Sequence, residues 1–319
     1  MVGIADIAKK AGVSMSTVSN VLNNRKNVGQ RTREKVLKIA EELSYEHKTQ
    51  NAEQRRKTII VNFSDFDTLF YLDILHGIND YASKRDYHLL VCTANDLIHY
   101  ANNDSICGVI VIDSHTDDST IISIANKHIP VITLDRELSH QMIKSILVSN
   151  YEGERQLMER LVEKGYEKFA FLKGHDTTDS KERYRAFRDV LKENDIPFSR
   201  NDLYEGDWHE QGGAQAARLI MLQERMPQVL VCANDMMAIG AIRKFQDNGI
   251  RIPDDIAVCG FDDIIISRYL GLTTVNVPDY ERGFLAGQAL INIIDGIGDY
   301  ETSHIGARVK WRSSTDSKR

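Results

Sequence analysis

Residues 4–23 read IADIAKKAGVSMSTVSNVLN, and this stretch decides the fold of the N-terminal segment. Apolar residues recur at helical spacing on one face of a first short helix: Ile4, Ile7, Ala8 and Ala11. Gly12 then permits a backbone turn that a side chain would hinder. A second helix is expected to begin near residues 14–16, because the serines there suit a helix cap. Two short helices joined by a glycine turn predict a helix-turn-helix unit.

The second helix has an apolar side and a polar side. Its inward residues are predicted to be Thr17, Val18, Val21 and Leu22, and its outward residues Met15, Ser16, Ser19, Asn20 and Asn23. Outward residues near the start of such a helix are those that can enter the major groove of DNA. A third helix over residues 32–44 is predicted to bury Val36, Leu37, Ile39, Ala40 and Leu43. The alternative is a three-helix unit with no nucleic-acid role.

Charge separates the N-terminal segment from the rest of the chain. Residues 1–57 hold 12 Lys or Arg and 6 Asp or Glu, a net charge of +6. The whole chain holds 40 and 46, so the remaining residues hold 28 and 40, a net charge of −12. Positive charge concentrated on one small segment favours phosphate binding there. The side chains expected at phosphates are Arg25, Lys26, Arg31, Thr32 and Arg33, and such contacts position a protein without reading sequence.

Length and composition predict a small head and a large body. The chain has 319 residues and 42% hydrophobic content, enough for a sizeable core. It has neither a signal-like apolar start nor an apolar run of about 18 residues, so we expect a cytoplasmic protein without membrane insertion. The cysteines lie in or beside apolar runs without CxxC spacing, which favours buried reduced thiols: Cys92, Cys107, Cys232 and Cys259.

The body alternates short β-rich runs with helical patterns. The β-rich runs lie at 58–63, 88–93, 107–112, 130–134, 168–172, 228–232, 256–259 and 274–277. The helical patterns lie at 72–84, 151–163, 181–193, 213–223, 236–248 and 280–295. This alternation predicts an α/β fold with parallel sheets covered by helices on both faces. Its length favours two lobes over a single sheet.

Polar and aromatic residues follow several of these strands, where open α/β sheets bind ligands. The residues predicted to contact a ligand are Ser64, Phe70, Tyr71, Asp135, Arg183, Trp208, Asn234 and Asp262. Together they suit a sugar or sugar phosphate, because charged groups hydrogen-bond hydroxyls while an indole covers a ring face. Each has a structural alternative. Asn234, Asp235 and Asp263 could be helix caps, Trp208 could belong to the core, and Arg183 could pair with Asp179 or Glu182.

The sequence gives little support to catalysis. It lacks the GxxxxGK[ST], GxGxxG, GxSxG and HExxH patterns, and its ten histidines show no ligand spacing. Without a nucleophile paired to a base, we predict that the protein is not an enzyme and uses no cofactor or metal.

With these residues the chain resembles the LacI/GalR family of bacterial transcription regulators. The matching segments of the head are Asp6-Ile-Ala, Ala11-Gly-Val-Ser, Thr17-Val-Ser, Val21-Leu-Asn and Thr32-Arg-Glu-Lys-Val. Those of the body are Leu134-Asp-Arg, Ala233-Asn-Asp with Ala238 and Gly240, Gly260-Phe-Asp-Asp, Leu272-Thr-Thr-Val and Arg312-Ser-Ser-Thr. The resemblance implies a body like a type I periplasmic binding protein, with two lobes linked by three crossovers around a ligand cleft. It also implies a homodimer on a pseudo-palindromic double-stranded operator.

The resemblance further implies roles for single residues. Met15, Ser16 and Asn20 fall on base-reading positions, and the eight predicted ligand residues fall on cleft positions. Asp262 and Arg183 would anchor hydroxyl or anionic groups, with Trp208 as the stacking wall.

Three features depart from the family pattern. Asn20 stands where the family usually has Arg, and an amide prefers adenine edges, so we expect an atypical operator. Residues 45–57 read YEHKTQNAEQRRK, with Gln54 in place of the hinge leucine that wedges into the minor groove. We therefore expect weaker kinking of DNA, with Arg55, Arg56 and Lys57 on phosphates instead. The stretch between Thr93 and Cys107 is also shorter than is usual.

The predicted organisation is a head at 1–45, a linker at 46–57, a two-lobed body at 58–315 and a tail at 316–319. The residues predicted to contact DNA are Met15, Ser16, Thr17, Ser19, Asn20, Asn23, Arg25, Thr32, Arg33, Gln54 and Arg55. The predicted function is a sequence-specific transcription regulator of the repressor kind, whose operator affinity is controlled by a sugar-like effector. The alternatives are a ligand-independent architectural DNA binder and a carbohydrate-processing enzyme fused to a DNA-binding head.

Overall fold

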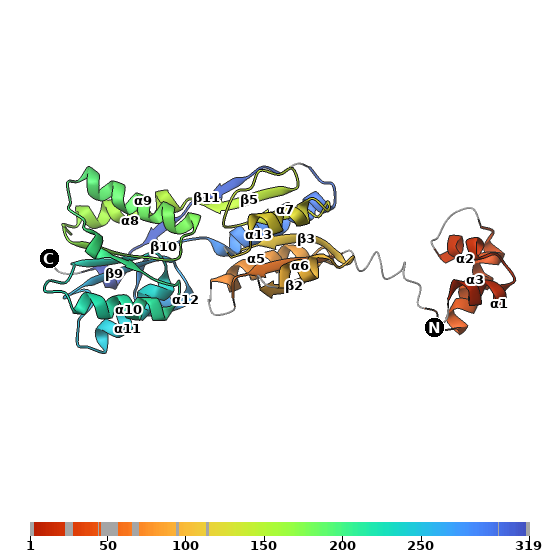
Figure 1. The fold of residues 1–319 in the computed structure, drawn as a ribbon, viewed down its shortest axis with the longest axis horizontal. Coiled ribbons are helices and arrows are strands. Elements are labelled where there is room, and N and C mark those ends of the chain that lie inside the picture. The colour runs from red at the N-terminus through yellow and green to blue at the C-terminus, as the bar shows by residue number, and fades with distance from the viewer. Residues whose placement is uncertain are drawn as a thin grey trace. The chain divides into compact units, whose positions relative to one another are not determined.

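The computed structural model describes residues 3–22, 28–43, 45, 57–65, 70–93, 96–112, 115–298 and 300–316. The chain divides into one unit of residues 1–58 with 104–106 and a second unit of residues 59–103 with 107–319 (Figure 1). Six residues predicted to contact DNA lie outside the described residues: Asn23, Arg25, Lys26, Gln54, Arg55 and Arg56.

The head is a three-helix unit. Its helices are α1 (Ile4–Ala11), α2 (Met15–Leu22) and α3 (Gln30–Glu42). They bury a small apolar core: Ile7, Ala8, Ala11, Val18, Val21, Val36, Ile39 and Ala40. The prediction for Leu37 is wrong, because its side chain is 47% exposed. Successive residues of a helix lie about 100° apart, so Leu37 points away from the face that carries Val36 and Ala40.

The turn between α1 and α2 contains the predicted glycine and the predicted serine cap. Gly12 adopts the left-handed backbone conformation at φ 67°, and its N–H donates to the carbonyl of Ala8. Ser14 Oγ accepts the N–H of Thr17 at 3.1 Å, which caps the start of α2. The glycine ends one helix and the serine begins the next.

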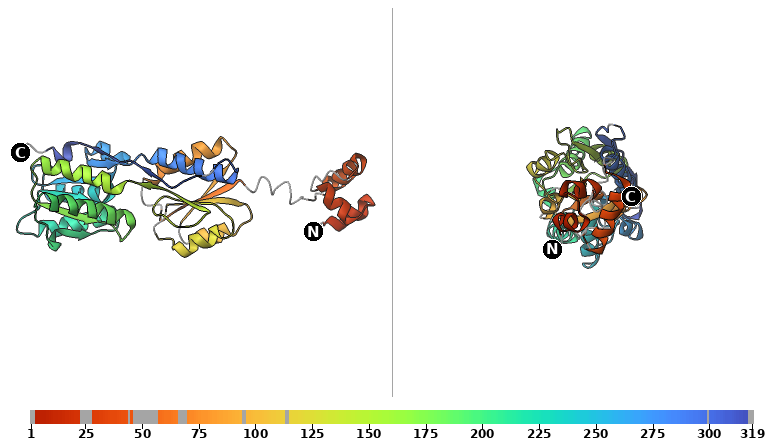
Figure 2. Two further views of the ribbon diagram at one scale, coloured as in Figure 1. Left: turned by 90° about the horizontal axis from the view of Figure 1, so that it is seen from above. Right: turned by 90° about the vertical axis from the view of Figure 1, so that its right-hand side faces the viewer.

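The first lobe of the body is built on a six-stranded sheet in the order β11-β5-β4-β3-β1-β2. The strands are β1 (Thr58–Phe63), β2 (His88–Thr93), β3 (Ile106–Val111), β4 (Val131–Thr133), β5 (Ile143–Val148) and β11 (Ser303–Ile305). The helices are α5 (Tyr71–Ser83), α6 (Leu97–Ala101), α7 (Asp118–Ala125) and α13 (Asp279–Ile294). Helices α5 and α13 lie on one face of the sheet and α7 on the other (Figure 2).

The second lobe has a sheet in the order β12-β10-β9-β8-β6-β7. The strands are β6 (Phe169–Lys173), β7 (Leu203–Glu205), β8 (Val229–Cys232), β9 (Ala257–Asp262), β10 (Thr273–Asn276) and β12 (Arg308–Lys310). Helices α8 (Asn150–Glu163) and α9 (Thr178–Glu193) lie on one face, and α10 (Glu210–Met221) and α11 (Asp235–Gln246) on the other (Figure 1). The short helices are η2 (Arg200–Asp202), α12 (Ile265–Tyr269) and η3 (Ser313–Thr315).

The two-lobed α/β prediction is confirmed, and the chain crosses between the lobes three times. The crossovers join β5 to α8, β10 to α13, and β11 to β12. The sheets are dominated by parallel pairs, with one correction: β12 runs antiparallel to β10, with Val275 opposite Val309. The expected strands do not include β5, a six-residue strand of the first lobe. They also lack β7, β11 and β12, whose three residues are too few to show a period.

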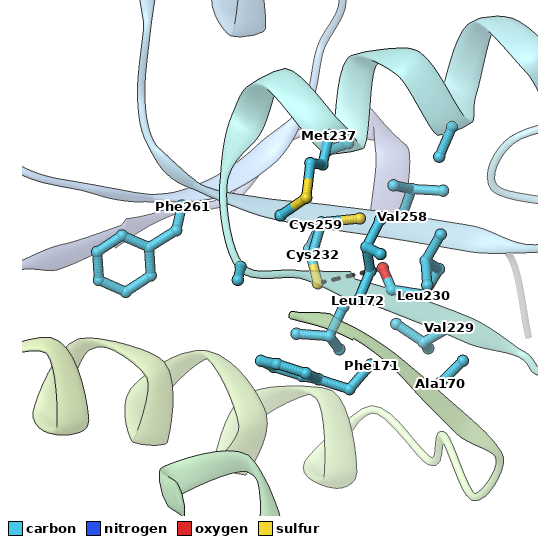
Figure 3. Close-up of a cluster of buried hydrophobic side chains, with 14 of the residues drawn as sticks. Ala170, Phe171, Leu172, Val229, Leu230, Cys232, Met237, Val258, Cys259 and Phe261 are labelled. Atoms are coloured by element: carbon cyan, nitrogen blue, oxygen red, sulfur yellow. Dashed lines mark hydrogen bonds between the residues drawn. The ribbon is translucent and has the colours of Figure 1, made fainter. Parts of the chain in front are cut away.

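The core of the second lobe explains the cysteine pattern. Cys232 and Cys259 lie in one buried cluster with Phe171 and Leu172, and the Cys259 thiol donates to the carbonyl of Leu230 at 3.8 Å (Figure 3). Burial raises the pKa of both thiols well above the ordinary value. Three of the four cysteines are buried, as predicted, and Cys107 is half-buried. Among the described residues, no helix is long and apolar enough to cross a membrane.

Candidate functional site

A cavity of about 840 Å³ lies between the two lobes of the body. All eight residues predicted to contact a ligand line it. The first lobe contributes Ser64, Phe70, Tyr71 and Asp135, and the second contributes Arg183, Trp208, Asn234 and Asp262. They meet because the carboxyl ends of parallel strands lie at one edge of each sheet, and the two edges face each other.

Arg183 and Asp262 form one ion pair of the cavity, with Nη1 3.6 Å from Oδ1. Arg183 also donates from Nε to Asn150 Oδ1 at 2.9 Å and from Nη1 to the carbonyl of Ala233. Its guanidinium stacks 3.6 Å over the ring of Phe261. Arg183 therefore pairs with Asp262, and not with Asp179 or Glu182 as the structural alternative proposed.

Asp262 has an unusual backbone and a half-buried side chain. Its φ is 113°, outside the regions that L-residues favour. Burial raises its pKa to about 7, and the charge of Arg183 opposes the shift. A strained residue with a perturbed carboxyl is a common mark of a functional site.

Trp208 lines the cavity from the same lobe as Arg183 and Asp262. Its ring covers Gly174 so closely that a Cβ on that glycine would overlap the indole. Its centroid lies 5.9 Å from the Arg183 guanidinium. Trp208 also packs against the second-lobe core while it remains partly exposed, so it is both a core residue and a cavity residue.

Some of the polar residues at strand ends have a structural role. Asn234 caps α11, since its Oδ1 accepts the N–H of Met237 at 3.0 Å, yet it also lines the cavity. Asp235 is fully buried and accepts hydrogen bonds from Ser267 and Thr274, which ties α11 to its neighbours. Asp263 pairs with Arg312 at 2.6 Å and serves the C-terminal segment.

Asp279 and Arg282 are two of the charged cavity residues that the sequence analysis missed. They lie on the first turn of α13, directly after the crossover from β10. Arg282 Nη1 lies 3.4 Å from Asp279 Oδ1, and Nη2 donates to the carbonyl of Leu134. Burial raises the pKa of Asp279 to about 7 and that of Asp135 to about 6. Asp279 lies three residues after the end of β10, so the search after strand ends could have found it.

Histidines also line the cavity from both lobes. His209 Nε2 lies 3.9 Å from Asp65 Oδ2, which links the start of α10 to the end of β1. The rings of His115 and His175 lie 6.1 Å apart in an edge-to-face arrangement. These pairs join the two lobes across the cavity. These histidines match no motif in the sequence, so the sequence analysis did not select them as ligand residues.

In the head, the described DNA-contact candidates lie on α2 and α3. Met15 is 60% exposed, Ser16 is exposed, and Thr17, Ser19 and Asn20 are half-buried. Ser14 Oγ forms hydrogen bonds of 2.8 Å with the hydroxyls of both Ser16 and Thr17. Thr32 and Arg33 are half-buried on the first turn of α3, and their N–H groups donate to the carbonyl of Gly29. The start of α2 therefore presents short polar side chains on a rigid, capped turn.

A helix-turn-helix head and a two-lobed body with a polar cavity between its lobes define a ligand-responsive DNA-binding protein. Comparison with known proteins agrees with this class. Residues 3–47 match "Bacterial regulatory proteins, lacI family", and residues 158–315 match "Periplasmic binding protein-like domain".

Two curated relatives cover nearly the whole chain. The "Probable HTH-type transcriptional repressor ExuR" of Bacillus subtilis is 33% identical over 310 residues, which cover 92% of each chain. The "HTH-type transcriptional repressor PurR" of Vibrio atlanticus is 30% identical over 309 residues, again 92% of each chain. The protein belongs to the lacI family of bacterial transcription regulators.

Two solved structures are similar over the full length. The "transcriptional regulator CelR-cellobiose complex" has a TM-score of 0.74 and 25% identity, with 98% of this chain and 100% of the other covered. The lac repressor dimer bound to operator and the anti-inducer ONPF has a TM-score of 0.74 and 27% identity, with 99% of each chain covered. The relatives are named as transcriptional regulators and not as enzymes.

Proposed function

We propose that the protein is a cytoplasmic, homodimeric transcriptional repressor whose affinity for a pseudo-palindromic operator is controlled by a sugar or sugar derivative. The observation that carries this proposal is the cavity between the lobes, where Arg183, Asp262 and Trp208 lie together. An ion pair beside an indole ring suits a polyhydroxylated ring compound. The cellobiose complex of a similar regulator supports the same ligand class.

The mechanism is a shift between conformations of the body. A ligand that contacts both lobes favours the arrangement in which those contacts are made, and in a dimer this alters how two heads meet two half-sites. Binding of the ligand is then linked to operator affinity by about 1–3 kcal/mol, or about 5–150-fold. The effector can act as an inducer or as a co-repressor, according to which arrangement binds DNA.

Exposed apolar side chains support the dimer. In the second lobe, Tyr269 is 84% exposed and Leu222 83%, and in the first lobe Leu72 is 60% exposed. Apolar side chains mark an interface where they gather in one patch, whereas single ones are ordinary, so the most exposed of them is the one to test. Tyr269→Glu should therefore produce monomers in sedimentation experiments and weaken operator binding, whereas Tyr269→Phe should remain dimeric.

The function is tested in two steps with the full chain. Selection from a random duplex library at several salt concentrations should recover a palindrome, with affinity that falls steeply with salt. Cellobiose and a panel of other sugars are then titrated against the operator complex. Asp262→Ala should retain operator affinity and lose the response, because that carboxyl belongs to the body and not to the head.

Two outcomes would contradict the proposal. If saturation with a verified ligand left operator affinity unchanged, the protein would be a ligand-independent DNA binder. If no duplex were enriched, the sequence-specific role would be wrong.

A further inference from the structure

The carboxyl of Glu154 lies inside the second lobe without a hydrogen-bond partner. Its side chain is fully buried on α8, and neither oxygen has a partner within the described residues. A buried carboxylate without a partner is costly, so the group either holds a proton or needs a cation beside it. Burial raises the pKa of Glu154 to about 8, which favours the proton. The question is which cation serves this group when the proton leaves.

Three residues of the neighbouring elements interact with the charge of Glu154. Cys232 of β8 and Cys259 of β9 are buried thiols, and burial raises the pKa of both well above the ordinary value. Neither thiol therefore carries a charge near neutral pH. The third residue is Arg183 of α9, whose positive charge favours the ionised carboxylate. Arg183 is the member of this set that can compensate the ionisation of Glu154.

Two contacts anchor Arg183 close to this carboxyl. Arg183 Nε donates to Asn150 Oδ1 at 2.9 Å, and Asn150 lies four residues before Glu154, on the same face of α8. The guanidinium also stacks 3.6 Å over the ring of Phe261, whose Cζ lies 3.4 Å from the Cβ position of Gly153. Arg183 is therefore tied to the helix that carries Glu154, while it also lines the cavity.

The contact of Arg183 with the cavity carboxylate is the looser one. Nη1 lies 3.6 Å from Asp262 Oδ1, which is beyond the range of a hydrogen bond. Asp262 is half-buried and lines the cavity, so water or a ligand can solvate it when the guanidinium leaves. The fully buried carboxyl of Glu154 has no such access to solvent. An ionised Glu154 therefore needs the arginine more than Asp262 does.

We propose that Glu154 is a positioning residue for Arg183, and that its ionisation draws the guanidinium away from Asp262 and toward the interior of the second lobe. At low pH the protonated carboxyl leaves Arg183 with Asp262. At high pH the proton passes to solvent, the carboxylate takes the arginine, and Asp262 faces the cavity without its cation. The cavity then presents different hydrogen-bonding groups at the two pH values. The consequence for an effector rests on the proposed function, whereas the movement of Arg183 does not.

Crystals of the full-length protein, grown without effector and equilibrated at about pH 6 and about pH 9.5, test the movement directly. We expect Arg183 to lie nearest Asp262 at the lower pH and within hydrogen-bond distance of a Glu154 oxygen at the higher pH. In Glu154→Gln, the arginine should keep the low-pH position in both crystals. A native arginine that stays beside Asp262 at both pH values would overturn the proposal.

Tryptophan fluorescence tests the same movement in solution. The chain has two tryptophans, and Trp311→Phe leaves Trp208 as the reporter, with its ring 5.9 Å from the Arg183 guanidinium. In this background the emission should change with a component centred near pH 8. Glu154→Gln should remove that component. Other buried carboxyls titrate in both proteins, so the difference between the two titrations isolates Glu154.

Three further variants separate this role from a merely structural one. Glu163→Gln, on an exposed carboxyl of the same helix, should keep the native titration. Glu154→Asp retains a carboxyl and should retain a pH-dependent component. Arg183→Met should lose the component, although Glu154 is still present to ionise.

Two results in solution would contradict the proposal. A component that persists in Glu154→Gln, with folding verified by the melting temperature, would assign the titration to another group. A component that persists in Arg183→Met would show that Glu154 ionises without moving the arginine. Neither experiment contains a sugar, so a negative result leaves the sugar-controlled repressor intact, and a protein that answers to no sugar can still show the movement of Arg183.

Discussion

The side-chain amide of Asn234 donates to the backbone carbonyl of Trp208 at 2.9 Å, while its oxygen accepts the N–H of Met237 at 3.0 Å. One side chain thus caps α11 and holds the cavity wall. Trp208 needs such support, because its backbone adopts φ 71°, where only glycine is unstrained.

Substitutions at Asn234 should separate the two roles. Asn234→Asp keeps the capping oxygen and loses the donor, so the melting temperature should change little while effector affinity falls and the tryptophan fluorescence shifts. Asn234→Ala also loses the cap, which should cost about 1 kcal/mol of stability. Equal effector affinity in native and Asn234→Asp proteins would show that the bond to Trp208 has no role in binding.

Glycines at helix contacts should not tolerate even a methyl group. A Cβ on Gly213 of α10 would overlap the carbonyl oxygen of Met237, and a Cβ on Gly240 of α11 would overlap that of Glu210. Ala usually stabilises a helix by about 0.5–1 kcal/mol relative to Gly, but here overpacking should reverse the sign and cost about 1–3 kcal/mol. Gly306→Ala is the control, since nothing lies within 4 Å of its Cβ position. Urea unfolding gives the free energies, and a stabilised Gly213→Ala protein would refute this packing argument.

The buried carboxyl of Glu154 should make the body less stable as pH rises. Glu154 is fully buried on α8, and within the described residues neither of its oxygens has a hydrogen-bond partner. Burial raises its pKa to about 8 from the ordinary 4.5, against the opposing charge of Arg183. The folded state therefore holds a proton that the unfolded chain releases, so the free energy of unfolding falls as pH rises from about 4.5 to 8.

Glu154→Gln should remove this contribution. Between pH 5.5 and 8 the native protein should lose on the order of 2 kcal/mol more stability than the variant. Burial also raises the pKa of Asp235, Asp262 and Asp279, so the variant should retain a weaker decline. Glu167→Gln, on an exposed residue, should match the native profile. A native protein with constant stability across this interval would contradict the prediction.

The two kinds of DNA contact predicted for the head should respond differently to salt. Asn20→Ala should weaken binding to the selected operator by about 1–3 kcal/mol and leave the salt dependence unchanged, because an amide reads bases. Arg33→Ala should weaken binding to all duplexes and reduce the slope of log affinity against log salt by about one, because it loses one phosphate contact. Fluorescence anisotropy at several salt concentrations measures both. If Asn20→Ala changed the slope and not the specificity, the assignment of Asn20 to base reading would be wrong.

Local sequence patterns were sufficient to predict much of the fold of this protein. The period of apolar residues predicts α1 and α2 with the glycine turn between them, because the side chains that a helix buries are set by its own geometry. Continuous β-rich runs predict the central strands, since a strand covered on both faces must be apolar throughout. The cavity residues follow from the same topology: residues after parallel strands share one edge, so Asp135, Asn234 and Asp262 meet although they are far apart in the chain.

Only the tertiary structure decided the rest. The partner of Arg183 is Asp262, 79 positions away, and not its neighbours Asp179 or Glu182. Leu37 is exposed because α3 packs through the face that carries Val36 and Ala40. Strand β12 pairs with β10 because the third crossover brings it there. Arg282 lies six residues after β10, and the passage of the chain between the lobes places it against Leu134. Sequence patterns show which side chains a helix or strand must bury. The partner of a charged side chain depends instead on which distant segments of the chain pack beside it.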